Sequence, residues 1–160
     1  MIYAGIGSRS TPSDVLHEMA NTARRLATEG WLLRSGGADG ADAYFEYGCG
    51  DGAKEIWLPW RGFNGNQSQL ILPEFGAQFD RAIDIAASVH PAWNRCSSAA
   101  RRLHARNVLQ ILGADFSTPV DKVICWTPNG AVVGGTATAL KLATQHGIEI
   151  TNLATETKNL

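Results

Sequence analysis

Three features are scarce in this chain of 160 residues: cysteine, long apolar runs and net charge. The three cysteines, Cys49, Cys96 and Cys125, form no CxxC pair, and an odd number cannot make a complete disulfide framework. No apolar run approaches the roughly 20 residues of a membrane span, and the first residues lack the basic and apolar regions of a signal peptide. We therefore expect a soluble protein of the cytoplasm with no membrane partner.

Sequence signatures of metal and nucleophile sites are missing as well. The histidines are scattered along the chain at His17, His90, His104 and His146, and no HxxxH or HExxH spacing occurs. No GxSxG elbow is present either. The sequence therefore predicts neither a bound metal nor a cofactor.

The charge is close to balanced. A net charge of -1 and a pI of about 6.4 give no overall attraction to a polyanion, which disfavours nonspecific nucleic-acid binding. One local basic cluster, at residues 101–106, contains Arg101, Arg102, His104 and Arg106. It is either a solvated helix face or a phosphate-binding surface, and both interpretations stay open.

Glycine-rich turns are the chain's main positive signal. They lie at residues 7–10, 35–40 and 134–138, and each joins a strand-like run to a helix-like run. Glycine allows a sharp turn and close approach to a ligand, while the free N–H groups and dipole of the following helix favour phosphate. Arg9 adds a fixed positive charge to the first turn. A single turn of this kind can be purely structural, but three favour a phosphate-binding pocket.

The order of apolar runs predicts the fold. Strand-like runs at 2–6, 31–34, 55–58, 120–126 and 149–153 are separated mostly by helical patterns. That alternation predicts an α/β fold, a Rossmann-like, doubly wound and mainly parallel sheet in three layers. The length fits one domain over 1–160, with a frayed polar tail at 154–160.

Helix boundaries follow from caps and glycines. We expect a first helix over 12–30, capped by Ser10 or Thr11, and a second over 39–48. The segment 74–112 predicts two helices that break around 91–94. A last helix is expected from 134 or 135 to 147.

Acidic residues gather at the predicted second helix. Capping explains Asp39 or Asp42, but one of them can instead accept hydrogen bonds from ribose hydroxyls. Glu46 follows Asp42 at i,i+4 spacing, which makes Asp42 and Glu46 candidates for acid/base catalysis on a glycosidic bond. A solvent-facing acidic helix is the simpler interpretation. In the long loop after the third strand, Trp60 or Phe63 either stacks on a base or anchors the loop.

These motifs resemble the SLOG superfamily, which unites the Rossmann domain of DNA-processing protein A (Smf) with the LOG-like proteins. Residues 6–9 are similar to the first-strand GSR segment of the DNA-processing proteins, and 35–42 to their SGxAxGID turn. Residues 106–107 resemble their RN helix segment, and 134–138 their last glycine and threonine turn. The resemblance covers most of the chain and implies one phosphate-binding pocket at the carboxyl edge of the sheet. The candidate binding residues are Gly7, Ser8, Arg9, Ser35, Gly36, Gly37, Asp39, Asp42, Arg106, Asn107, Gly134, Gly135, Thr136 and Thr138.

Differences between this sequence and the LOG-type signature disfavour a catalytic function. LOG-type phosphoribohydrolases have a PGGxGTxxE signature, but here Val133 replaces its proline and Lys141 its catalytic glutamate. The resemblance therefore implies binding of a small nucleotide-derived ligand, such as an ADP-ribose-like or cyclic nucleotide signal, more than turnover. A phage protein that sequesters a host immune signal in the host cytoplasm fits this expectation.

Two alternatives remain. One is a hydrolase of an N-glycosidic or phosphate bond, and the other is single-stranded DNA binding through Arg9, Arg101, Arg102 and Arg106. The superfamily also implies a homo-oligomer, for which the helical region 74–112 with Trp93 is the candidate face.

Overall fold

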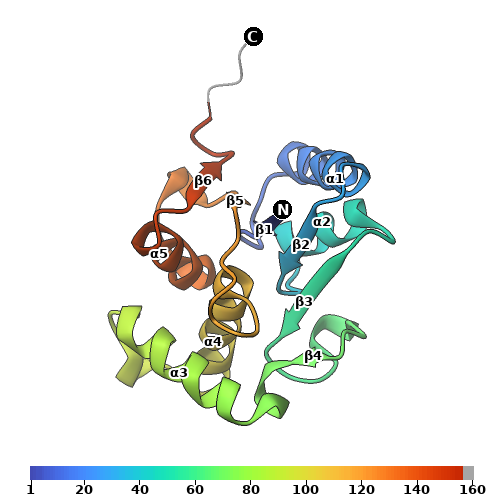
Figure 1. The fold of residues 1–160 in the computed structure, drawn as a ribbon. Coiled ribbons are helices and arrows are strands. Elements are labelled where there is room, and N and C mark those ends of the chain that lie inside the picture. The colour runs from blue at the N-terminus through green and yellow to red at the C-terminus, as the bar shows by residue number, and fades with distance from the viewer. Residues whose placement is uncertain (157–160) are drawn as a thin grey trace.

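The computed structural model describes residues 1–156 of the chain, and within them a parallel six-stranded sheet forms the centre (Figure 1). The strand order is β4-β3-β2-β1-β5-β6, and each neighbouring pair is parallel. The strands are β1 (Ile2–Gly5), β2 (Leu32–Ser35), β3 (Lys54–Leu58), β4 (Leu70–Ile71), β5 (Lys122–Cys125) and β6 (Glu149–Asn152). The predicted α/β, doubly wound fold is confirmed.

Five α-helices in the described residues cover the two faces of the sheet. They are α1 (Ser13–Thr28), α2 (Ala41–Cys49), α3 (Ala77–Val89), α4 (Ser98–Leu112) and α5 (Ala137–Gln145). Helices α1 and α2 pack with one apolar cluster, and α3, α4 and α5 pack with another, which gives three layers. Cover on both faces accounts for the runs of buried residues in the central strands β1, β2 and β5.

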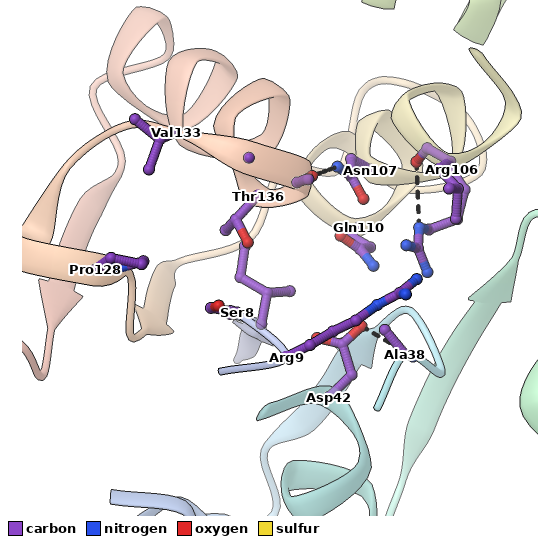
Figure 2. A pocket seen from close by; sticks show the side chains of 15 residues that line it. Ser8, Arg9, Ala38, Asp42, Arg106, Asn107, Gln110, Pro128, Val133 and Thr136 are labelled. Atoms are coloured by element: carbon purple, nitrogen blue, oxygen red, sulfur yellow. Dashed lines mark hydrogen bonds between the residues drawn. The ribbon is translucent and has the colours of Figure 1, made fainter. Parts of the chain in front are cut away.

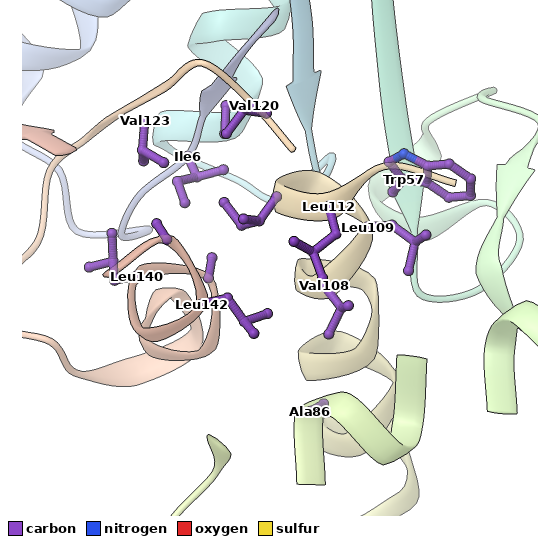
Figure 3. Close-up of a cluster of buried hydrophobic side chains, with 14 of the residues drawn as sticks. Ile6, Trp57, Ala86, Val108, Leu109, Leu112, Val120, Val123, Leu140 and Leu142 are labelled. Atoms are coloured by element: carbon purple, nitrogen blue, oxygen red, sulfur yellow. The ribbon is translucent and has the colours of Figure 1, made fainter. Parts of the chain in front are cut away.

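Each face of the sheet has its own core. The α1 stripe of Val15, Met19, Ala23 and Leu26 is buried, as its helical spacing predicts. On the opposite face, side chains of α3, α4 and α5 meet over the sheet (Figure 3). The second half of α4 is buried from residue 105 to 112, so this helix passes through the interior of the domain.

The structure corrects several predicted boundaries. Pro12, not Ser10 or Thr11, is the N-cap of α1, and it makes no side-chain cap bond. The Thr11 hydroxyl instead donates to the Ser8 carbonyl at 2.6 Å, which closes the first turn. Helix α5 begins at Ala137 because residues 134–136 form a short 3-10 turn before it. The sequence did not predict β4, which is only two residues long.

The described residues end in a turn just after the last strand. Residues 154–156 form a turn in which the N–H groups of Thr155 and Glu156 donate to the Asn152 carbonyl. The remainder of the predicted frayed tail, 157–160, lies outside the described residues. No helix among the described residues is both long and apolar enough to cross a membrane.

The strand order changes direction at β1. From β1 the chain moves outward through β2, β3 and β4, and then returns to place β5 on the other side of β1. Ligands of open α/β sheets bind at such a switch point, outside the carboxyl ends of the strands. The fold therefore predicts a ligand site at the segments that follow β1 and β5.

Candidate functional site

A pocket of about 350 Å³ lies at the carboxyl ends of β1 and β5 (Figure 2). This volume is at the lower end of the ~300–1,000 Å³ typical of small-molecule sites. The pocket is lined by the three glycine turns and their flanking residues, by the start of α2 and by α4. The lining residues are Ile6, Gly7, Ser8, Arg9, Ala38, Asp42, Leu103, Arg106, Asn107, Gln110, Pro128, Val133, Gly134, Gly135 and Thr136.

The first two turns pack directly against each other. Gly40 has a φ of 80°, and a Cβ at this position would lie 2.9 Å from both the Ser8 carbonyl oxygen and the Arg9 Cα. Only glycine combines this left-handed conformation with such close backbone contact. Gly40 therefore allows the start of α2 to lie beside the end of β1.

Asp42 links these two turns inside the pocket. Its carboxylate accepts the Ala38 N–H at 3.3 Å, and the N–H groups of Gly7 and Gly36 also stabilise its charge. Burial has the larger effect, however, and raises the pKa of Asp42 to about 6, even though the Arg106 charge opposes the shift. A carboxyl group with this pKa can exchange a proton near neutral pH.

Helix α4 supplies the opposite wall from buried polar side chains. The Arg106 guanidinium donates to the Gly36 carbonyl, and its Nε donates to the Leu103 carbonyl at 3.2 Å. Burial lowers the pKa of Arg106 while Asp42 raises it, and an arginine stays charged under these conditions. The Asn107 amide donates to the Gly135 carbonyl and so connects α4 to the third turn.

Arg9 is the exposed cation of the pocket. Its side chain extends past Asp42 toward Arg106 (Figure 2), and it makes no ion pair with a carboxylate in the described part of the chain. Opposite it, the third turn precedes the N-terminus of α5, with Gly134 and Gly135 exposed. Two guanidinium groups and a helix N-terminus thus border one cavity, which favours an anion.

The structure brings most of the predicted binding residues to this pocket. Gly7, Ser8, Arg9, Asp42, Arg106, Asn107, Gly134, Gly135 and Thr136 line it. Ser35 is buried outside it and donates to the Gly5 carbonyl at 2.6 Å, a contact that holds β2 to β1. Gly36 lies beneath Arg106 and Gln110, where a side chain would collide with both.

Gly37, Asp39 and Thr138 also lie outside the pocket. Gly37 and the exposed Asp39 border a separate, open hollow next to α2. Thr138 contacts His104, with Oγ1 and Nδ1 2.9 Å apart. Burial and the charges of His90, Arg106 and Lys141 lower the pKa of His104 to about 4, so this imidazole is neutral at pH 7.

The two candidate catalytic carboxylates do not share a site. Asp42 lies in the pocket, but Glu46 faces the neighbouring hollow, where it accepts from the Asn66 amide at 2.8 Å and lies 3.9 Å from the Lys54 ammonium. One helical turn separates them on α2, yet each borders a different cavity. Acid/base chemistry at the pocket would therefore depend on Asp42 alone.

The long loop after β3 anchors itself to the domain. Phe63 is buried and meets Trp60 edge to face, with ring centroids 5.1 Å apart. The Arg106 guanidinium carbon lies 5.6 Å from the Phe63 ring centre. Neither aromatic ring lines the pocket, so the anchoring interpretation agrees with their positions.

Sequence reasoning missed several lining residues. Gln110 follows Arg106 at i,i+4 spacing on α4, so the helical period could have placed it on the same face. The apolar contributors, Ile6, Leu103, Pro128 and Val133, have no local signature because they come from four separate segments. Together they give the pocket an apolar part beside its cationic part.

Comparison with known proteins does not extend this description. No protein-family model, curated protein or solved structure matches the chain. The site is a pocket at the switch point between β1 and β5, and it contains two arginines, one buried carboxyl group and an apolar wall.

Proposed function

We propose that this protein binds a small, phosphate-bearing, nucleotide-derived molecule in the pocket at the ends of β1 and β5. The main support is the convergence of Arg9, Arg106 and the N-terminus of α5 on one cavity of about 350 Å³. Charge-assisted hydrogen bonds from guanidinium groups and backbone N–H groups are the usual means of holding phosphate.

The remaining pocket surface suits the rest of a nucleotide. Leu103, Pro128 and Val133 offer apolar contact to a base, and Asn107 and Gln110 offer amide groups for a base edge or a sugar. Binding without turnover is the favoured mode, because Lys141 occupies the position of the family's catalytic glutamate. Sequestration of a signalling nucleotide is a role that such binding would serve.

Hydrolysis of an N-glycosidic bond is the second candidate function. The observation that favours it is Asp42, whose pKa of about 6 would let it donate or accept a proton beside a bound sugar. Its hydrogen bond to Ala38 and its proximity to the Gly7 and Gly36 N–H groups also give it a structural role. Turnover assays must therefore separate the two roles.

Single-stranded DNA binding has less support from the geometry. Arg106 is buried, and Arg101 is half-buried with its guanidinium carbon 5.2 Å from the Trp93 ring centre. Arg102 is exposed but does not line the pocket. The arginines of α4 therefore do not form one continuous track for a phosphate backbone.

Native mass spectrometry tests these functions together. The protein would be mixed with mononucleotides, ADP-ribose isomers, cyclic dinucleotides and a short oligodeoxynucleotide. An adduct with one unchanged small nucleotide supports binding, and product masses support the hydrolase. Binding of the oligonucleotide alone would contradict the proposal. The same spectra report whether the chain forms the homo-oligomer that the resemblance implies.

Two arginine variants locate the site. Arg9→Ala should weaken the nucleotide adduct more than tenfold, because one charge-assisted contact contributes about 1.5–3 kcal/mol. Arg102→Ala is the matched control, since it removes the same charge from an exposed position outside the pocket. Equal loss in both variants would indicate general electrostatic attraction instead of this pocket.

A further inference from the structure

Three side chains with metal-binding atoms meet outside the pocket. They are His90 at the end of α3, Cys96 in the following loop and His104 in α4. One donor atom from each lies within 4.8 Å of the other two, and all three residues are half-buried. The long spacing between these residues conceals the cluster in the sequence.

The distance between Cys96 and His90 is close to that in a zinc site. Zinc bonds of about 2.3 Å to sulfur and 2.0–2.1 Å to nitrogen, at a tetrahedral angle, place sulfur and nitrogen about 3.6 Å apart. The Cys96 Sγ lies 3.7 Å from Nε2 and 3.9 Å from Nδ1 of His90. The His90 and His104 ring centroids are 4.5 Å apart. All three donor atoms lie within 4.8 Å of one another, so the side chains must move closer together to bind one ion.

The surroundings orient the three side chains. Thr138 Oγ1 lies 2.9 Å from Nδ1 of His104, which leaves Nε2 of this ring for a metal. A hydrogen bond of this kind fixes the orientation of a metal-binding imidazole. Nδ1 of His90 accepts the Ala92 N–H at 3.0 Å, so coordination through this atom would exchange that hydrogen bond for a metal bond.

A short loop positions the cysteine. The N–H of Cys96 donates to the Trp93 carbonyl at 3.0 Å, and that of Arg95 donates to the Ala92 carbonyl at the same distance. These bonds form a single turn that returns the chain from His90 toward the start of α4. The site therefore combines a helix with a hydrogen-bonded loop, which holds Cys96 near both histidines before an ion binds.

We propose that His90, Cys96 and His104 form a Zn²⁺ site with a fourth position open to water or another ligand. One thiolate and two imidazoles are donors that zinc accepts and that magnesium and calcium do not prefer. The half-buried setting gives an ion access to the cluster. The site is separate from the nucleotide pocket and does not depend on the function proposed for it.

Metal binding would also stabilise the wall of the pocket. Helix α4 contains His104 as well as Arg106 and Asn107, and Thr138 belongs to α5. An ion that binds only the folded state raises stability by RT ln(1 + c/Kd), where c is the free ion concentration, so the gain grows with the logarithm of its affinity. Zinc would thus hold the end of α3, the loop and α4 in their present arrangement.

Titration of the full-length, reduced, chelator-treated protein tests the site. The probes are Zn²⁺ alone, in competition with a chromophoric chelator, and Co²⁺, whose near-ultraviolet thiolate band reports cysteine coordination. The expected result is one equivalent of either ion per chain, with the thiolate band present for Co²⁺. A folded protein, verified by circular dichroism, that binds no stoichiometric ion would overturn the proposal.

Variants assign the ligands. Cys96→Ala and His104→Gln should each weaken Zn²⁺ binding by more than about tenfold, since loss of even an outer partner costs about 10–100-fold. Cys49→Ala and His146→Gln are the matched controls and should bind as the parent protein does, because both residues lie outside the cluster. The Co²⁺ thiolate band should be absent from Cys96→Ala alone. Retention of that band in Cys96→Ala would reject this ligand set.

Discussion

At the scale of single residues, Asp42 is where burial and charge oppose each other most directly. The residue is 4% exposed, and the pKa of its carboxyl group is raised from 3.8 to about 6. Its charged form is therefore less stable in the folded chain than in the unfolded one. The resulting loss of stability begins as pH rises past the unfolded pKa and is complete above the folded pKa.

Asp42→Asn should therefore stabilise the protein above pH 6. The expected gain at pH 8 is up to about 3 kcal/mol, the equivalent of the pKa shift, which already includes the attraction of Asp42 to Arg106. At pH 4 the gain should nearly vanish, because Asp42 is then neutral in the folded protein. Urea unfolding at both pH values measures this difference. Asp39→Asn, at an exposed position, is the control and should change little at either pH.

A large side chain at Gly135 should block the pocket without disturbing the fold, whereas a side chain at Gly36 should disturb the fold. A Cβ at Gly135 meets no atom within 4 Å, whereas one at Gly36 collides with buried Arg106 and Gln110. Gly135→Leu should remove the nucleotide adduct in native mass spectra while stability changes by no more than about 0.5 kcal/mol. Gly36→Ala should lower both nucleotide binding and the stability of the fold. If Gly135→Leu binds nucleotide normally, the ligand does not occupy this cavity.

At the scale of elements, α1 and α2 pack through a glycine. A Cβ at Gly48 would lie 2.7 Å from the Ala20 Cα and would also meet the Ala20 carbonyl. Gly48→Ala should therefore separate the two helices and destabilise the protein by about 1–3 kcal/mol, despite the better helix propensity of alanine. Urea unfolding measures the change. Tyr47→Ala, at a position that is 73% exposed on the same helix, should stay within about 0.5 kcal/mol of the parent.

Elements differed in how far the sequence could predict them. The α1 stripe repeats at helical spacing over about three turns, so its position and buried face were predictable. Strand β4 was not, because two residues carry no period. The start of α5 was placed too early because a 3-10 turn and an α-helix share the same glycine and threonine signals. The cluster of His90, Cys96 and His104 needs the packing of α3 on α4, which no local spacing encodes.

At the scale of the whole molecule, alternating strand and helix patterns were enough to predict the parallel sheet. The family resemblance implied that the glycine turns surround one pocket at the carboxyl edge, and the first and third turns do meet at the pocket. The division of Asp42 from Glu46 was not predictable, since it depends on how α2 lies between two cavities.

The place of β5 in the sheet also determines when the fold can form. Tyr3 of the central strand β1 pairs with Leu33 of β2 on one side and with Lys122 of β5 on the other. Strand β1 can therefore complete its pairing only after β5 has been synthesised. At ribosomal rates of about 5–20 residues per second, the second edge of β1 stays unpaired for on the order of ten seconds during synthesis. An open strand edge is a template for aggregation. Chains released at residue 118, before β5, should therefore sediment as aggregates, whereas the 160-residue chain should fold once β5 and β6 have left the ribosome.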